Sequence, residues 1–159
     1  MRQFLSVLGL VSVAACGSST GTIDPGMGGT WVGTSTVAIA GQAAPTTFTG
    51  QQVVVSVDGG TAQVAGICPS GGSLSSGTVT ATGNEDTASW SASVACPAVT
   101  IGSSPSVTIT YTAGTTSCAM AMNTMMMDVV TLTNVSNGTV PAAGGGTNQV
   151  VVTFTGTKQ

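Results

Sequence analysis

The chain has very few charged side chains and no histidine. Its 159 residues include two Lys or Arg and five Asp or Glu, so charged residues make up 4% of the sequence. Proteins that bind nucleic acids carry clustered basic residues, and segments that bind anionic lipid headgroups are polybasic. Neither pattern is present, so the sequence predicts no nucleic-acid partner.

The shortage of titratable side chains also argues against catalysis. General acid–base catalysis most often uses His, and a reactive Ser or Thr needs a neighbouring base. The adjacent carboxylates Glu85 and Asp86 fall in the turn-like stretch GNED. We expect this pair to be solvated at a hairpin tip, and we predict that the protein is not an enzyme and uses no cofactor.

Aromatic residues are scarce as well, at 4% of the chain. Barrels that span membranes carry girdles of aromatic residues at both interfaces. The composition therefore argues against a membrane-spanning barrel. Because 42% of the chain is still hydrophobic, we expect it to fold around a core rather than stay disordered.

An apolar segment at residues 4–15 follows the positive charge of Arg2. It is shorter than the 20 or so residues that a membrane-spanning helix needs. A charged start, a short apolar core and the small residues Ala14 and Ala15 are the parts of a secretory signal peptide. We therefore predict that residues 1–15 are a signal peptide and that the protein is exported.

The stretch Val13-Ala14-Ala15-Cys16 resembles the lipobox of bacterial lipoproteins, in which an aliphatic residue and two small residues precede an obligatory cysteine. The resemblance covers residues 1–16. It implies that the Cys16 thiol carries diacylglycerol, that the chain is cut before Cys16, and that the new amine is acylated, for example with palmitate. Gly17 then favours the outer membrane, facing the periplasm or the surface. An ordinary signal peptide with an incidental cysteine is the alternative.

The rest of the chain divides into a tether and one domain. Residues 17–29, GSSTGTIDPGMGG, have the composition of a flexible linker. We predict a lipidated Cys16 with its tether over residues 16–29, which attaches the protein to the membrane. Residues 30–159 are enough for one domain and too few for two domains of typical size.

Alternation of apolar and hydroxyl residues with a period of two predicts β-strands. It is clearest at 89–96, 106–113 and 149–157, with weaker candidates at 30–40, 47–57, 61–68, 76–82, 116–122 and 127–136. The inward positions of the clear strands are Trp90, Ala92, Val94, Cys96, Val107, Ile109, Tyr111, Ala113, Val150, Val152 and Phe154. Turns are predicted at Asp58-Gly59-Gly60, Gly83-Asn84-Glu85-Asp86 and Asn137-Gly138.

The predicted strands carry almost no Lys, Glu or Pro, the residues that protect an exposed sheet edge. A closed sheet needs fewer such residues. The fold class predicted is all-β, an antiparallel β-barrel or a closed β-sandwich of about eight to nine short strands.

The stretch Gly29-Thr30-Trp31 resembles the G-x-W opening of the first strand in lipocalins and the G-T-W opening of streptavidin-like barrels. The resemblance covers three residues. It implies that Trp31 packs at the base of a barrel. A core Trp that merely follows a Gly turn is the alternative.

Setting Cys16 aside leaves three cysteines, Cys68, Cys96 and Cys118, in an oxidising compartment. Cys68 and Cys96 both precede Pro, in GICP and VACP, at the ends of predicted strands. This parallel favours a Cys68–Cys96 disulfide, with Cys118 as a buried free thiol. The other two pairings stay open.

Methionine is concentrated in the stretch CAMAMNTMMMD. On a strand, Cys118, Met120 and Met122 would share one face. Methionine commonly fills irregular gaps in cores, whereas soft sulfur ligands select Cu(I). We expect Met120 and Met122 to pack inward as core, with a Cu(I) site as the alternative.

Together these patterns predict a membrane-anchored extracytoplasmic lipoprotein. Its non-enzymatic β-domain would be a structural or interaction module of the cell envelope, with another envelope protein as partner. The alternative is a lipocalin-like barrel that holds a small apolar ligand in its mouth, and a periplasmic Cu(I)-binding protein is less favoured. Whether the barrel interior is filled or open distinguishes the first two functions.

Overall fold

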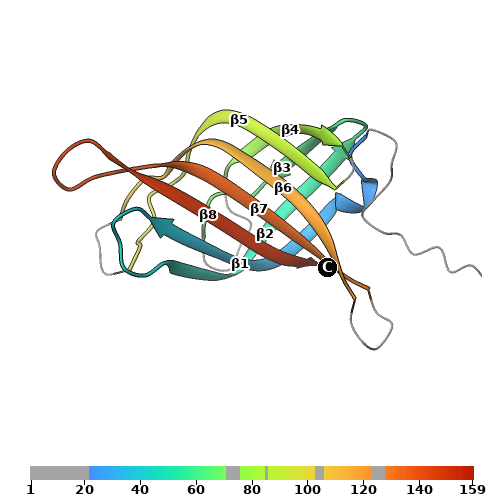
Figure 1. The fold of residues 1–159 in the computed structure, drawn as a ribbon, viewed down its shortest axis with the longest axis horizontal. Helices are drawn as coiled ribbons and strands as arrows, with labels where there is room; N and C mark the ends of the chain where they lie inside the picture. Colours follow the sequence, from blue (N-terminus) through green and yellow to red (C-terminus); the bar gives the residue numbers. More distant parts are fainter. Residues whose placement is uncertain (1–21, 71–75, 85, 103–105, 123–127) are drawn as a thin grey trace, which may run out of the picture.

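Eight antiparallel strands close into one barrel in the computed structural model (Figure 1). The structure describes residues 22–70, 76–84, 86–102, 106–122 and 128–159, with the backbone alone at 120–122 and 128–130. The strands are β1 (Gly29–Ile39), β2 (Thr46–Asp58), β3 (Thr61–Ala65), β4 (Thr78–Asn84), β5 (Thr87–Ala95), β6 (Thr110–Met122), β7 (Asp128–Pro141) and β8 (Thr147–Lys158).

Each strand pairs with the next along the chain, and β1 pairs with β8 to complete the ring. This up-and-down order removes every sheet edge. Closure explains how strands with so few charged residues avoid pairing with other chains. The all-β prediction is confirmed, with a barrel rather than a sandwich.

The two faces of the barrel wall have opposite chemistry. Along β8, Val150, Val152 and Phe154 are buried, whereas the outward-facing Thr155 and Thr157 are exposed. The strand register extends this hydroxyl-rich face around the barrel, because Thr155 lies between Thr34 of β1 and Thr133 of β7. The interior is therefore mainly apolar and the exterior is lined by neutral hydroxyl groups.

Two predicted turns are found where the sequence indicates them. Gly59 and Gly60 join β2 to β3, and Gly59 adopts a φ of +58°, which favours glycine. The second turn follows Asn84, which pairs with Thr87 of β5. Glu85 itself lies outside the described residues.

The predicted turn at Asn137-Gly138 is wrong, because both residues lie inside β7. Gly138 pairs with Tyr111 of β6, and a Cβ at Gly138 would collide with the backbone of Thr110 and Tyr111. Glycine here permits a close approach of two strands rather than a reversal of the chain. The chain turns instead at residues 142–146, where the Ala142 amide donates to the Gly146 carbonyl at 3.1 Å.

Two predicted strands, 106–113 and 116–122, form largely one strand, so the barrel has eight strands rather than nine. Gly114 lies inside β6, and this position requires glycine because the Trp90 ring packs over it. A Cβ there would approach the ring to 2.5 Å. The start of the predicted strand 106–113 does not belong to β6. Val107 forms an isolated bridge with Val99 instead.

Bulges change the inward positions of two strands. The register shifts between Tyr111 and Ala113, after which Thr116 and Cys118 are the buried residues. A second shift, between Ser91 and Val94, leaves Ala92 exposed instead of inward. In β6 the inserted residue reverses the period-two pattern that follows it. In β5 the half-buried Val94 and the buried Cys96 keep the phase of Trp90.

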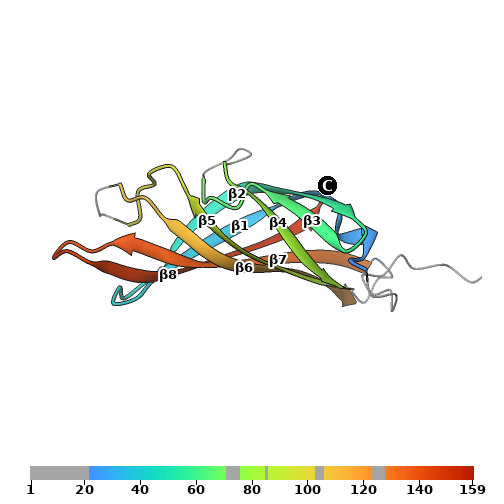
Figure 2. The ribbon, with the colours of Figure 1, turned by 90° about the horizontal axis from the view of Figure 1, so that it is seen from above.

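A short helix, η1 (Pro25–Met27), closes one end of the barrel, here called the base. Asp24 caps it, accepting a hydrogen bond from the Gly26 amide at 2.6 Å. Ile23 and Met27 are fully buried, so this part of the predicted tether 16–29 packs against the domain instead of hanging free. Both ribbon views place η1 beside the β2–β3 turn, and the β7–β8 turn projects from the opposite end, the mouth (Figures 1 and 2). No helix in the described ranges has the length and apolar character needed to cross a bilayer.

Candidate functional site

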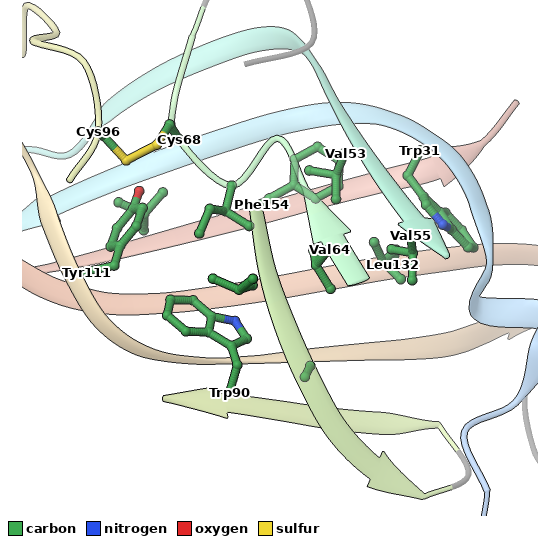
Figure 3. Close-up of a cluster of buried hydrophobic side chains, with 14 of the residues drawn as sticks. Trp31, Val53, Val55, Val64, Cys68, Trp90, Cys96, Tyr111, Leu132 and Phe154 are labelled. Carbon is green, nitrogen blue, oxygen red and sulfur yellow. A yellow bond between two sulfur atoms is a disulfide. The ribbon is translucent and has the colours of Figure 1, made fainter. Parts of the chain in front are cut away.

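Large side chains fill the barrel interior. Trp31, Tyr111 and Phe154 are each at most 1% exposed. Figure 3 shows Trp31 towards one end, Phe154 and Trp90 in the middle, and Tyr111 below the Cys68–Cys96 disulfide. An eight-stranded barrel is just wide enough for side chains to fill. Large side chains therefore take up much of the interior along the length that these residues span.

A pocket of about 320 Å³ lies at the mouth, where β1 and β7 end and β8 begins. Its lining residues are Ile39, Gln42, Ile101, Val107, Val140, Pro141, Ala142, Ala143 and Asn148. Most of these side chains are apolar, two are carboxamides and none is charged. The pocket can hold a small apolar group and offer its polar end a hydrogen bond, and its described lining residues include no nucleophile or general base.

The connection between β5 and β6 forms one wall of this pocket. The Val99 and Val107 backbones exchange two hydrogen bonds of 2.9 Å, and the Thr100 and Ser106 hydroxyls lie 3.0 Å apart. Ile101, only 1% exposed, enters the pocket from this connection. Its side chain is therefore held at the mouth by a braced loop.

A second pocket of about 320 Å³ lies beside the disulfide. Its lining residues are Cys68, Pro69, Ser70, Ser76, Pro97, Ala98, Val99 and Thr100. Val99 contributes to this pocket, and its bridge partner Val107 lines the mouth pocket. The β5–β6 connection thus borders both pockets.

The predicted Cys68–Cys96 disulfide is confirmed, with a Cα–Cα distance of 5.5 Å. It joins the loop after β3 to the residue that follows β5, and both sulfurs belong to buried residues. Gln51 braces the same loop from inside the barrel, since its amide nitrogen donates to the Gly66 carbonyl at 2.8 Å and to the Cys68 carbonyl at 3.1 Å. The Cys-Pro parallel in the sequence identified the correct pair.

The prediction that Cys118 is a free thiol is wrong. Cys118 is buried on the inner face of β6 and is disulfide-bonded, and no cysteine among the described residues is free. The prediction set Cys16 aside as a lipid attachment point, which left an odd number of thiols. The chain holds four cysteines, and an even number allows all of them to pair.

The remaining predicted sulfur sites fall largely outside the described residues. Cys16 is one of them, and so are the side chains of Met120 and Met122, although their backbone continues β6 opposite Val130 and Asp128. Inward packing of the two methionines therefore stays a prediction. The disulfide state of Cys118 removes the thiolate that a Cu(I) site on this face would use.

Trp31 closes the base from inside. Its indole nitrogen donates to the Met27 carbonyl of η1 at 2.9 Å, so its polar atom is satisfied. Lys158, the last residue of β8, lies 5.6 Å from the centre of the Trp31 ring and donates to the Gly26 carbonyl at 3.0 Å. The two ends of the domain meet at this residue.

Polar residues inside the barrel were not anticipated from the sequence. Thr116 donates to the Asn134 side-chain oxygen at 2.8 Å, and the Asn134 amide donates to the Ser136 hydroxyl at 3.0 Å, all three side chains being buried. Gln51 and Ser35 are also fully buried. Gln51 alternates in phase with Val53 and Val55 along β2. This spacing is the sequence signal that could have predicted an inward-facing Gln51.

Burial also affects the one tyrosine of the chain. Tyr111 is fully buried, and desolvation raises the pKa of its phenol well above the ordinary value near 10. Its phenol therefore stays neutral in the folded protein at every physiological pH.

No protein-family model matches the chain, and no curated protein or solved structure is significantly similar to it.

Proposed function

We propose that the protein is a lipid-anchored module of the bacterial cell envelope, held at the outer membrane through Cys16. Its non-enzymatic barrel would act there as a structural or interaction domain. The observation that carries this proposal is the Val13-Ala14-Ala15-Cys16 stretch, which precedes the barrel domain. The large side chains in the interior support a structural or interaction role, because they leave the outer surface as the main contact area.

The distribution of hydroxyl groups supports an anchor outside the barrel. A barrel in lipid presents an apolar band on its outer face, whereas the outer face here carries residues such as Thr34, Thr133 and Thr155. Membrane attachment would then come from the N-terminal lipid. A neutral, hydroxyl-rich surface would meet an envelope partner through hydrogen bonds rather than through ion pairs.

Expression of the full chain in a Gram-negative bacterium tests the anchor. We expect the protein to partition into detergent, with a mature chain that starts at a triacylated Cys16. Cys16→Ser should stop processing, whereas the control Cys118→Ser should leave processing intact. A mature N-terminus at any other residue would overturn the proposal.

The Cys16 sulfur allows a second, independent test. A thioether to diacylglycerol and a disulfide use the same sulfur atom, so one excludes the other. The test therefore follows the Cys16 sulfur itself: after reduction, the Cys16 peptide of the lipidated protein should still carry diacylglycerol, because a thioether resists reduction. A Cys16 peptide that gains a free thiol on reduction would contradict lipidation.

The mouth pocket favours a second function, the binding of a small apolar ligand. Its volume of about 320 Å³ is at the lower end for ligand pockets, and its lining is apolar with the carboxamides of Gln42 and Asn148. Barrels of eight strands, including lipocalins and streptavidin, can hold one small ligand. This resemblance rests on the architecture and on Gly29-Thr30-Trp31.

Titration with 1-octanol, followed by NMR, tests this second function. We expect saturable shifts for Ile39 and Val140. Ala143→Trp, at an exposed position on the pocket rim, should block binding, and Val151→Trp on the outer face of β8 is the control. Equal shifts in both variants, or none in the wild type, would exclude the pocket as a ligand site.

A further inference from the structure

Four buried side chains in the barrel each have a polar atom without a hydrogen-bond partner in the described part of the chain. These atoms are Ser35 Oγ, Gln51 Oε1, Trp90 Nε1 and the Tyr111 hydroxyl. The residues are between 0% and 4% exposed. A buried donor or acceptor that is left unsatisfied is destabilising, so four in one interior require a common explanation.

The four side chains come from facing walls of the barrel. Gln51 on β2 pairs with Gly33, two residues before Ser35 on β1. Trp90 on β5 and Tyr111 on β6 pack edge to face, with ring centres 6.4 Å apart. In a closed ring of eight strands, β1–β2 and β5–β6 are four strands apart. Inward side chains from these walls point towards the same axis.

Two of the side chains extend towards the same loop. The Tyr111 hydroxyl points towards the Cys68–Cys96 disulfide (Figure 3). The Gln51 amide group is fixed there by its bonds to the Gly66 and Cys68 carbonyls, and this leaves its oxygen as a free acceptor. The Tyr111 hydroxyl, which can donate, and the Gln51 oxygen, which accepts, thus both lie on the inner side of the loop that holds Cys68.

The polar network of Thr116, Asn134 and Ser136 lies near Trp90 but makes no hydrogen bond to its nitrogen. The Trp90 indole covers Gly114, where a Cβ would be 2.7 Å from Nε1. Gly114 pairs with Ser136, which already accepts from Asn134. The Trp90 nitrogen therefore lies beside a hydrogen-bonded network without belonging to it.

The chemistry of the four atoms defines what would satisfy them. Trp90 Nε1 can only donate, Gln51 Oε1 can only accept, and the Ser35 and Tyr111 hydroxyls can do either. The buried core of the described residues has no charged side chain near them, since its one buried acid, Asp24, caps η1 at the base. An ion would be unpaired there. A neutral molecule with both donor and acceptor groups fits.

We propose that the barrel interior is a binding site for a neutral guest that both donates and accepts hydrogen bonds, held by Tyr111, Gln51, Trp90 and Ser35. Ordered water and a small neutral solute such as an amide share this chemistry. The pocket beside the disulfide, which Cys68 lines, gives the outer side of the same loop a route to solvent. This site is separate from the apolar pocket at the mouth and does not depend on the lipid anchor.

The two tryptophans provide an internal comparison for the test. In protein with 15N-labelled Trp, the Trp90 indole N–H should show cross-relaxation with water or with a guest, whereas the Trp31 N–H, bonded to the Met27 carbonyl, should not. Native mass spectrometry distinguishes the sources: a retained neutral mass identifies a solute, and its absence together with water cross-relaxation identifies water. Either source supports the site. If neither signal is found, the proposal fails.

Removal of single hydroxyl groups should change the folding equilibrium constant in opposite directions, depending on whether a guest is bound. If a guest bonds to Tyr111, Tyr111→Phe should lower the folding equilibrium constant about fivefold at pH 7, because a hydrogen bond is lost. If the hydroxyl is unsatisfied, the same change should raise this constant. Ser35→Ala should act in the same direction and be non-additive with Tyr111→Phe if both bind one guest. Thr155→Val on the outer face is the control and should change little. An increase in both inner variants would overturn the proposal.

Discussion

The two tryptophans of the chain lie in opposite surroundings. Trp31 at the base donates to the Met27 carbonyl, and Lys158 lies against its ring. Trp90, further from the base, is as well buried but has no partner for its N–H among the described residues. One ring completes a closed structure, and the other borders polar groups that still need partners.

This difference separates structural from functional parts of the barrel. At the base, η1, Trp31 and the end of β8 satisfy one another and close the interior. Towards the mouth, the structure has two pockets, a disulfide loop and unpartnered polar atoms. Polar groups without partners are costly, so binding is expected at the mouth half and stability at the base.

Truncation at the base should have the largest effect. Trp31→Ala removes a fully buried ring and leaves the Met27 carbonyl without its donor. Loss of a buried Trp side chain costs about 3–5 kcal/mol, so we expect this decrease in the free energy of unfolding, measured in urea. A loss below about 1 kcal/mol would show that the base does not depend on Trp31.

Removal of the disulfide should be the largest effect at the mouth. Cys68→Ala combined with Cys96→Ala opens a link between residues 28 positions apart. The chain-entropy estimate for such a loop is about 3–4 kcal/mol. Hydrogen exchange should rise mainly around Gly66 and Val99, while the amides next to Trp31 stay protected. Uniform loss of protection would show that the two halves unfold as one unit.

The sequence predicts the architecture of this barrel better than its details. Period-two alternation identifies most of β8, predicted at 149–157, since this strand contains no bulge. It fails at Ala92, which the register shift in β5 leaves exposed, and at Ala113, where the bulge in β6 reverses the phase. Gly114 and Gly138 resemble turn residues in sequence, but the reason for glycine at each is a ring or a strand that is distant along the chain.

The candidate sites were harder to predict for the same reason. The mouth pocket combines the ends of β1 and β7 with a loop between β5 and β6, and no local pattern connects them. The interior site needs the barrel closed before Gln51 and Tyr111 face each other. The Cys-Pro repeat succeeded because both cysteines end segments that closure brings together.

The buried phenol predicts loss of stability at high pH. The pKa of Tyr111 is raised by burial in the folded state, and an unfolded tyrosine has a pKa near 10. Above pH 10 the unfolded state releases a proton that the folded state keeps. The free energy of unfolding should then fall by up to about 1.4 kcal/mol per pH unit from this group, whereas the contribution is fully present below pH 10. Tyr111→Phe should remove this part of the slope, as measured by urea unfolding between pH 9 and 11, and an unchanged slope would refute the assignment.

The smallest expected effect tests the link between the two ends of the domain. Lys158 is exposed, so the interaction of its ammonium with the Trp31 ring is worth only about 0.5–1 kcal/mol. Lys158→Met keeps an apolar side chain against the ring but removes the charge and the bond to the Gly26 carbonyl. We expect a loss within that range in the free energy of unfolding, together with faster amide exchange in η1 and no change at Trp90. Faster exchange at Trp90 as well would mean that base and mouth are coupled, and the separation between a structural and a binding half would no longer hold.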